Sequence, residues 1–204
     1  MKLFLFDFDG VLVDSLDVYE KTVTDCLQKI NQPLMRGREE FLELFEGNFY
    51  ESLAKRGVDL DKFMESSVNI LAGVDYSKMK PFGAMLPVLE DLKINHQLIV
   101  ISSNDSPTIQ EALRLYNFNG IFKEILGADF MFSKKEKILY AAKKYSAAPN
   151  DIYYIGDTTG DIKEGKQAGI KTVGVTWGWH SKEKMAAAKP DYLFDTPQEL
   201  LQLN

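Results

Sequence analysis

Residues 2–15 read KLFLFDFDGVLVDS, an apolar run from Lys2 to Phe6 that stops abruptly at Asp7 and Asp9. A short run without polar alternation is typical of a strand that is buried on both faces of a parallel sheet. In open α/β sheets, ligands bind beyond the carboxyl ends of the strands. The stretch therefore predicts a buried parallel strand that carries acidic side chains at the ligand-binding edge of its sheet.

Further strands are predicted where short apolar runs recur, at Gln97–Ile101, Asp151–Ile155, Lys171–Val175 and, more weakly, Tyr192–Phe194. Helical patterns alternate with these runs, over Pro107–Tyr116, Lys134–Tyr145, Asp161–Ala168 and Pro197–Leu201. Strands that alternate with helices form a parallel sheet with right-handed crossovers. We therefore expect an α/β fold, with a three-layer Rossmann-like core built on a parallel sheet.

Residues 15–80 have a different character, because the pattern there is helical throughout. The helical stretches are Val18–Ile30, Glu39–Phe45, Phe49–Arg56 and Leu60–Leu71. No run between them has the pattern of a convincing strand. We predict that residues 1–14 and 81–204 form the α/β core. Residues 15–80 are then an inserted, all-helical cap domain that lies over the crevice.

Length and composition are those of an ordinary globular chain, with 204 residues, 45% hydrophobic and 26% charged. The net charge of -6 argues against nucleic acid as a partner, because binding its backbone needs clustered positive charge. We expect no signal peptide and no membrane span, since no apolar run approaches the roughly 20 residues of a span. The lone Cys26 excludes an intramolecular disulfide framework and fits a reducing compartment. These features predict a cytoplasmic location, and they make no prediction of an oligomeric state.

Polar residues with oxygen-bearing side chains follow three of the predicted strands: Asp7 with Asp9, Ser103 with Asn104, and Asp157 followed by Asp161. Parallel strands bring their carboxyl ends to one edge, so these side chains are expected to gather there. Carboxylates gathered this closely repel one another and need a cation, and a hard divalent ion such as Mg²⁺ prefers oxygen ligands. The coordination of protein-bound Mg²⁺ is usually completed by water molecules and substrate phosphate, so the cluster indicates a phosphorylated ligand.

The same residues resemble the motifs of a known family. The stretch from Asp7 to Ser15 (DFDGVLVDS) resembles the first motif of the haloacid dehalogenase superfamily of phosphohydrolases. Ser103 resembles the second motif, Lys134 the third, and Gly156-Asp157 with Asp161 the fourth. The resemblance covers essentially the whole chain in the right order, and it implies that the insertion is the small helical cap of this family. Within the family, residues 168–178 (AGIKTVGVTWG) are similar to phosphoglycolate-phosphatase-like members.

The resemblance also implies roles for individual residues. Asp7 is expected to attack phosphorus and form an aspartyl-phosphate, and Asp9 to protonate the leaving oxygen and then activate water. Lys134 is expected to place a positive charge against the phosphate and Asp7. The expected ligands of Mg²⁺ are Asp7, Asp9 through its main-chain carbonyl, Asp157 and Asp161. The expected phosphate-binding residues are Ser103, Asn104 and Gly10.

Two of these assignments have open alternatives. The phosphate-binding hydroxyl is either Ser103 or Ser102, because the end of the strand is uncertain by one residue. The third-motif lysine is Lys134, Lys135 or Lys137, because the proline that usually follows it in relatives is missing here. Helical phasing, and Ser133 as a cap, favour Lys134.

The leading function is a Mg²⁺-dependent phosphatase that acts on a small phosphorylated metabolite. A sugar phosphomutase of the beta-phosphoglucomutase type would use the same aspartates but return the phosphoryl group to the substrate. A haloacid dehalogenase attacks carbon and needs no metal, so Asp9 and the acidic fourth motif argue against it. An inactive binding module predicts damage to at least one motif, whereas all of them are present.

Other reactive or aromatic residues are expected to be structural. Cys26 falls on an apolar helical face, where a small buried thiol is far commoner than a nucleophile. His96 and His180 have no neighbouring ligand pattern, and the aromatic cluster around Trp177 is expected to pack beside the rim of the site. The helically spaced aromatic residues of the insertion are expected to form the cap core, with one or two facing the substrate: Phe41, Phe45, Phe49 and Tyr50.

Overall fold

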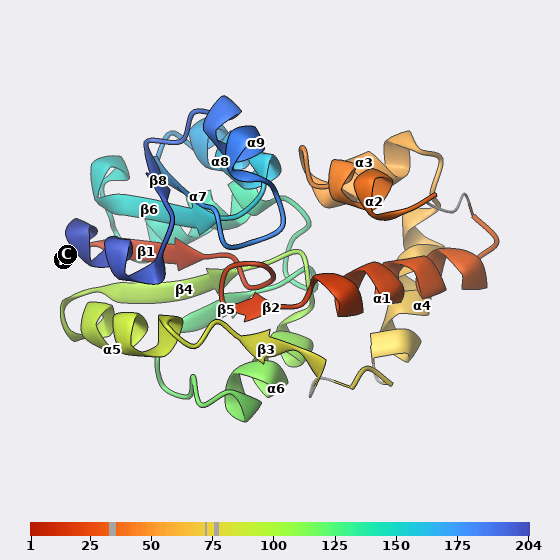
Figure 1. The fold of residues 1–204 in the computed structure, drawn as a ribbon, viewed down its shortest axis with the longest axis horizontal. Coiled ribbons are helices and arrows are strands. Elements are labelled where there is room, and N and C mark those ends of the chain that lie inside the picture. The colour runs from red at the N-terminus through yellow and green to blue at the C-terminus, as the bar shows by residue number, and fades with distance from the viewer. Residues whose placement is uncertain (33–35, 72, 76–77) are drawn as a thin grey trace.

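The computed structural model describes residues 1–32, 36–71, 73–75 and 78–204. Its centre is a six-stranded sheet in the order β5-β4-β1-β6-β7-β8, in which every pair of neighbours is parallel (Figure 1). The strands are β1 (Leu3–Phe6), β4 (Gln97–Ile101), β5 (Glu124–Leu126), β6 (Ile152–Gly156), β7 (Lys171–Val175) and β8 (Tyr192–Phe194). The predicted parallel α/β fold is confirmed, and the strand that opens the chain lies near the middle of the sheet.

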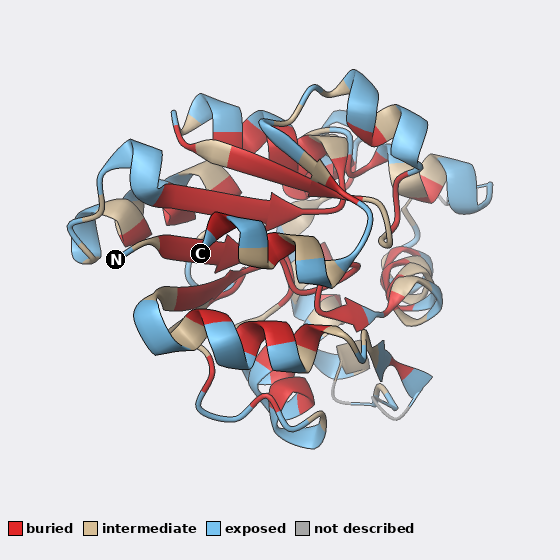
Figure 2. Ribbon diagram, turned by 60° about the vertical axis from the view of Figure 1, so that its left-hand side comes forward, coloured by how far each residue is buried: buried red, intermediate tan, exposed pale blue. Residues whose placement is uncertain are grey.

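Helices cover both faces of the sheet. They are α5 (Met85–Asn95), α6 (Ser106–Leu115), α7 (Lys134–Lys144), α8 (Thr159–Gln167) and α9 (Lys182–Ala187), with the 3₁₀ segments η2 (Pro149–Asp151) and η3 (Pro197–Leu203). Phe4 and Phe6 of β1 pack in one apolar cluster with residues of α5, α6 and η3, whereas Leu3 and Leu5 pack in another with residues of α7. Both faces of β1 are therefore buried, as Figure 2 shows, which is why its sequence does not alternate.

Four helices lie between β2 (Val13–Asp14) and β3 (Lys80–Pro81), two short strands that pair antiparallel where the chain leaves and rejoins the core. These helices are α1 (Leu16–Lys29), α2 (Arg38–Glu43), α3 (Phe49–Lys55) and α4 (Leu60–Leu71), and they form the group beside the sheet in Figure 1. We keep the division into a core of 1–14 and 81–204 and a cap of 15–80 as a proposal, and below we call these helices the cap.

The cap has an apolar cluster of its own. The predicted cap-core residues Phe41, Phe45, Phe49 and Tyr50 are buried in it, and so is Cys26. Trp179, from the loop after β7, belongs to the same cluster, so the cap packs directly on the core. Within the described ranges, every helix falls short of the length and apolar character that a membrane crossing requires.

Candidate active site

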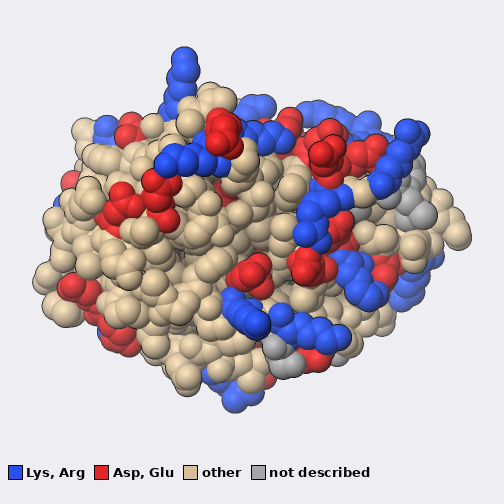
Figure 3. Space-filling view, in the orientation of Figure 1, with Lys and Arg blue, Asp and Glu red and all other residues tan. Residues whose placement is uncertain are grey.

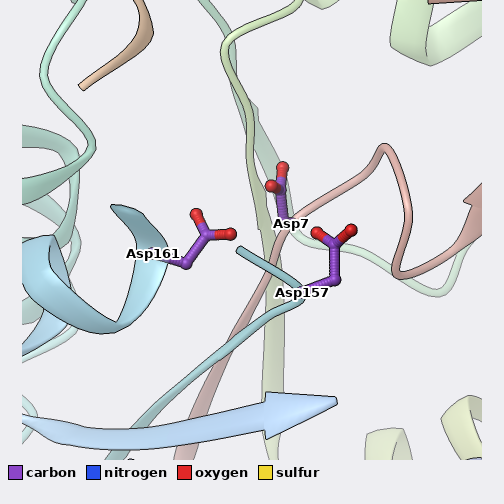
Figure 4. Close-up of side chains that lie close together, drawn as sticks. All are labelled: Asp7, Asp157 and Asp161. Atoms are coloured by element: carbon purple, nitrogen blue, oxygen red, sulfur yellow. The ribbon is translucent and has the colours of Figure 1, made fainter. Parts of the chain in front are cut away.

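Acidic side chains from two neighbouring strands meet at the carboxyl edge of the sheet. Asp7 directly follows β1, Asp157 directly follows β6, and Asp161 lies in the first turn of α8 (Figure 4). One carboxylate oxygen from each residue lies within 4.8 Å of the others, and all three residues are buried. The sheet thus brings together the carboxylates that the sequence pattern predicted to meet.

The loop after β1 is shaped by Gly10. Its φ of +74° lies in the left-handed region, and a Cβ atom there would collide with the carboxylate of Asp157. The backbone N–H of Phe8 donates to Asp7 Oδ1 at 2.7 Å, which fixes the Asp7 carboxylate relative to its own loop. Gly10 therefore lets the loop pass close to Asp157, which follows the neighbouring strand.

Lys134 lies at the start of α7, where Ser133 caps the helix by accepting from the N–H of Glu136. The Lys134 ammonium donates to Asp7 Oδ2 and to Asp161 Oδ1, each at 2.6 Å. Burial acts to lower the pKa of Lys134, but the charges of Asp161 and Asp7 outweigh it and hold that pKa well above its usual value. Lys134 is therefore a buried, permanently charged cation between two carboxylates.

The other two candidate lysines have different partners. Lys137 is fully buried, and its ammonium donates to the carbonyl of Ser102 at 2.5 Å. Lys135 is half-buried, and its backbone N–H donates to Glu164. Of the three lysines, Lys134 is the one whose ammonium contacts Asp7.

Asp161 is held by hydrogen bonds from three directions. Thr158 donates to its Oδ2 through both the backbone N–H and the hydroxyl, in a capping box that begins α8. The Tyr154 hydroxyl donates to Oδ1 at 2.8 Å. Burial acts to raise the pKa of Asp161, but Lys134 and these donors leave it below its usual value. Asp161 therefore stays a carboxylate.

Asp157 has the opposite surroundings. Its Oδ2 accepts from the N–H of Trp179 at 2.7 Å, but its Oδ1 is buried and accepts no hydrogen bond from the described part of the chain. Burial raises the pKa of Asp157 well above its usual value, and the charges of Asp161 and Asp7 raise it further. A buried carboxylate oxygen that accepts no hydrogen bond destabilises the fold unless a cation binds to it. The unpartnered oxygen and its acidic neighbours fit a hard divalent cation, so this cluster is a candidate metal site.

Asp9 lies apart from the three clustered carboxylates. Its Oδ1 accepts from the Ser15 hydroxyl at 2.6 Å, and the side chain of Asn104 also hydrogen-bonds to it. Burial raises the pKa of Asp9 to about 6, although these two donors act against the rise. Burial likewise raises the pKa of Asp7 to about 7, against the lowering effect of Lys134. Asp9 can therefore exchange a proton near neutral pH, as a general acid and base must.

A small pocket opens above these groups, and we call it the catalytic pocket. Of the predicted site residues, those that line it are Asp7, Asp9, Ser103, Lys134 and Asp157. Ser102 also lines it, but the Ser102 hydroxyl accepts from the N–H of Asn104 at 3.0 Å. Asp161 and Asn104 are buried beside the pocket, and Gly10 forms the turn next to Asp157. The structure thus gathers every predicted site residue at one edge of the sheet.

Four residues of the pocket wall were not among the predicted site residues: Tyr19, Phe45, Thr158 and Trp179. Phe45 is, however, one of the four cap aromatic residues of which one or two were expected to face the substrate. Thr158 and Trp179 follow β6 and β7, so their position after a strand was a readable signal. Tyr19 and Phe45 come from the cap, and the sequence gives no sign of which cap aromatic residues face the core. Tyr50, also from the cap, donates to the carbonyl of Ser103 at 2.6 Å and so ties α3 to the phosphate-binding candidate.

Known proteins resemble this chain in sequence and in fold. Residues 4–175 match the family described as haloacid dehalogenase-like hydrolase. A phosphoglycolate phosphatase of Aquifex aeolicus is 30% identical over 217 residues, covering 100% of this chain and 96% of the relative. A pyrophosphatase of Bacillus velezensis is 24% identical, covering 98% and 94%. The solved structure of a predicted phosphatase from Clostridium acetobutylicum has the same fold, with a TM-score of 0.84 at 22% identity over 98% of this chain and 96% of that one. The chain therefore belongs to the haloacid dehalogenase-like hydrolase family, as a phosphatase-type member similar to phosphoglycolate phosphatases.

Proposed function

We propose that this protein is a Mg²⁺-dependent phosphatase that hydrolyses a small phosphorylated metabolite through an aspartyl-phosphate on Asp7. The observation that carries the proposal is the position of Asp7. Its carboxylate lines the catalytic pocket, is held by Lys134 at 2.6 Å, and lies two residues from Asp9, whose pKa is raised to about 6. A nucleophile, a fixed cation and a proton carrier in one small pocket are the parts that phosphoryl transfer requires.

In the first step, a carboxylate oxygen of Asp7 attacks phosphorus and the bond from phosphorus to the ester oxygen breaks. The protonated form of Asp9 gives its proton to the departing oxygen, so the leaving group departs as a neutral alcohol. The Lys134 ammonium stays beside Asp7 throughout and offsets the negative charge of the phosphoryl group. The products of this step are the alcohol and a phosphorylated Asp7.

In the second step, the Asp9 carboxylate removes a proton from a water molecule, whose oxygen attacks the phosphorus of the aspartyl-phosphate. The bond between phosphorus and the Asp7 oxygen breaks, which releases inorganic phosphate and restores both aspartates. Ser15 and Asn104 orient Asp9 for both proton transfers. The Ser103 residue, in the pocket wall, is placed to hold a phosphoryl oxygen.

Asp7, Asp157 and Asp161 are the residues that would hold Mg²⁺. When bound, Mg²⁺ supplies neutralisation of the charge on the phosphoryl oxygens. Asp157 offers the unpartnered Oδ1, and Asp161 is oriented by Thr158 and Tyr154. We also propose a cytoplasmic location, which the single, buried Cys26 fits.

A panel of phosphorylated metabolites tests this proposal, with release of inorganic phosphate as the readout. The unmodified protein should release phosphate from at least one compound in the presence of Mg²⁺, whereas Asp7→Asn should release none. A phosphomutase would instead interconvert sugar phosphates with little free phosphate. The proposal is wrong if no compound gives phosphate, or if Asp7→Asn is as active as the unmodified protein.

A further inference from the structure

A second pocket lies between the cap helices and the loop after β4, and we call it the cap pocket. Tyr19 and Ser103 line both the cap pocket and the catalytic pocket. A phosphoryl group at Asp7 would therefore have the rest of its molecule directed toward the cap pocket. The lining of the cap pocket is what the leaving group of the substrate would meet.

Aromatic and apolar side chains form most of this lining. Phe49 of α3 and Phe63 and Met64 of α4 stand among the lining residues, with Cys26 of α1 beside them. Phe49 and Phe63 are buried and pack edge to face at 6.1 Å between ring centroids. Burying apolar surface against such a wall favours a ligand with an apolar face.

The charged side chains around the two pockets are mostly acidic. Asp105 lines the cap pocket, and Asp7, Asp9 and Asp157 line the catalytic pocket. Among the described residues that line either pocket, the one lysine or arginine is Lys134, which already contacts Asp7 and Asp161. Positions 33–35, 72 and 76–77, outside the described ranges, carry no Lys, Arg or His in the sequence.

Two phenols of the cap pocket lie in surroundings that disfavour negative charge, chiefly because they are buried. Burial raises the pKa of Tyr50 well above its usual value, and the carboxylates of Asp105 and Asp129 contribute to the rise. Burial also raises the pKa of Tyr19 well above its usual value, with Tyr50 and Asp9 adding to the rise. Surroundings that hold phenols in their neutral form would also disfavour a carboxylate or phosphate on the ligand.

Three cationic side chains of the cap helices form ion pairs on the outer surface of the cap. Lys21 pairs with Asp25 at 2.5 Å, Arg38 with Asp17 and Glu20, and Arg56 with Glu43. Figure 3 shows basic and acidic side chains interspersed over the cap side of the molecule. These three cations do not line either pocket, so they are not available to a second anionic group of a bound substrate.

We infer that the leaving group of this phosphatase is an uncharged alcohol or phenol with an apolar face, which binds in the cap pocket. Phosphoglycolate and pyrophosphate, whose leaving groups carry negative charge, are then poor substrates. The inference rests on the proposed function, and it narrows the class of phosphate esters that the same site takes. The physical reason is that a second anion would be desolvated beside Asp105, in a pocket whose described lining holds no lysine or arginine to pair with it.

A matched pair of esters tests this inference directly. Phosphoglycolate and its amide have nearly the same size but differ in one negative charge, so we expect kcat/KM to be at least tenfold higher for the amide. Along ethyl, butyl and hexyl phosphate, kcat/KM should rise by about fourfold per methylene until the pocket is full. Phosphate release with phosphoglycolate or pyrophosphate equal to or better than the neutral esters overturns the inference alone. No release from any ester overturns the proposed function as well.

A charge introduced into the cap pocket gives a second test. Ser67 of α4 lines the cap pocket, whereas the adjacent Val68 is 69% exposed. Ser67→Arg should raise the ratio of phosphoglycolate to phosphoglycolamide activity at least tenfold, and Val68→Arg should leave that ratio unchanged. Thermal unfolding of both variants checks that they fold. A ratio that stays constant in Ser67→Arg, or that moves equally in the two variants, contradicts the inference.

Discussion

At the scale of single residues, Lys134 and Lys137 show how position decides the state of a buried ammonium. Both belong to the first turns of α7 and both are buried, but Lys134 contacts two carboxylates and Lys137 contacts a backbone carbonyl. Burial, together with the charge of Lys134, lowers the pKa of Lys137 to about 7. Below neutral pH the surroundings of Lys137 therefore disfavour its charged form, whereas those of Lys134 favour the charged form.

The free energy of unfolding should vary with pH in a way that depends on Lys137. Its pKa is about 7 in the folded state and near 10.5 in the unfolded state, so the unfolded state binds more protons between these values. Stability contributed by this site therefore rises as the pH increases from about 7 toward 10. Lys137→Met should abolish this rise and raise the free energy of unfolding at pH 6 by roughly 1–4 kcal/mol. Urea unfolding at pH 6 and pH 9 measures both effects.

The exposed Lys143, in the last turn of α7, provides the control. Lys143→Met should leave both the free energy of unfolding and its pH dependence close to those of the unmodified protein. If Lys137→Met keeps the full rise between pH 7 and 9, the assignment to Lys137 is wrong.

Asp9→Asn should lower kcat by roughly 10²–10⁴-fold, because the amide can neither give nor take the proton. The loss in the first step should be larger with ethyl phosphate than with p-nitrophenyl phosphate, since p-nitrophenolate leaves without needing a proton. Steady-state kinetics with the two esters measures the difference. An equal and small loss with both esters would remove Asp9 from proton transfer.

At the scale of elements, the cap is joined to the core through the start of α8. The N–H of Gly160 donates to the carbonyl of Phe45 at 2.9 Å. His180 accepts from the N–H of Thr159 through Nδ1, which leaves its Nε2 to donate to the carbonyl of Leu42 at 3.1 Å. Both contacts hold the segment that carries Phe45 over the catalytic pocket.

Gly160→Ala should therefore disturb catalysis more than folding. A Cβ atom on Gly160 would lie 2.7 Å from the Phe45 carbonyl and closer still to that of Gly47, so the cap must move away. We expect kcat/KM to fall roughly 10–100-fold, because small displacements of positioning groups cost that much. Gly47→Ala in the facing loop is the control, since its Cβ would meet only Lys163 Nζ, at 4.0 Å. Equal activity of the two variants would show that this contact does not position the cap.

The helices and strands that could be predicted from the sequence are mostly those with a clear local pattern of apolar residues. The cap helices and β1, β4, β6 and β7 have long or continuous apolar patterns, and their bounds agree with the structure within a few residues. α5 was not predicted, although its buried Met85, Val88, Leu89 and Leu92 have helical spacing. β5 has three residues and pairs only with β4 at the sheet edge, so its conformation depends on tertiary pairing. The predicted helix at Pro197–Leu201 is a 3₁₀ segment that runs to Leu203.

At the scale of the whole molecule, the positions of site residues can be predicted where they depend on the topology of the sheet. They cannot be predicted where they depend on how the cap packs against the core. Asp7, Ser103 and Asp157 follow strands, so a parallel sheet places them at one edge whatever the details of packing. Tyr19 and Phe45 reach the pocket because the cap closes on the core through Trp179, which no local pattern encodes. The reaction class was therefore readable from the sequence, and the cap side of the pocket wall was not.

Mg²⁺ should stabilise the folded protein through Asp157. At a concentration of 100 times its Kd, a bound ion adds about 2.7 kcal/mol, which for a chain of this size raises Tm by roughly 5–10 °C. Asp157→Asn should lose most of this increase, because the unpartnered Oδ1 is no longer anionic. Thermal unfolding with Mg²⁺ and with NaCl at equal ionic strength measures the specific effect. An equal increase in the Asp157→Asn variant would place the ion elsewhere.

The central claim, that Asp7 carries the phosphoryl group, is tested most directly by mass spectrometry of acid-quenched protein during turnover of p-nitrophenyl phosphate in H₂¹⁸O. The account predicts a phosphoryl group on the peptide that contains Asp7, with ¹⁸O in the released phosphate and none in the Asp7 carboxylate. Turnover without phosphorylation of that peptide, or with ¹⁸O in Asp7, would contradict it.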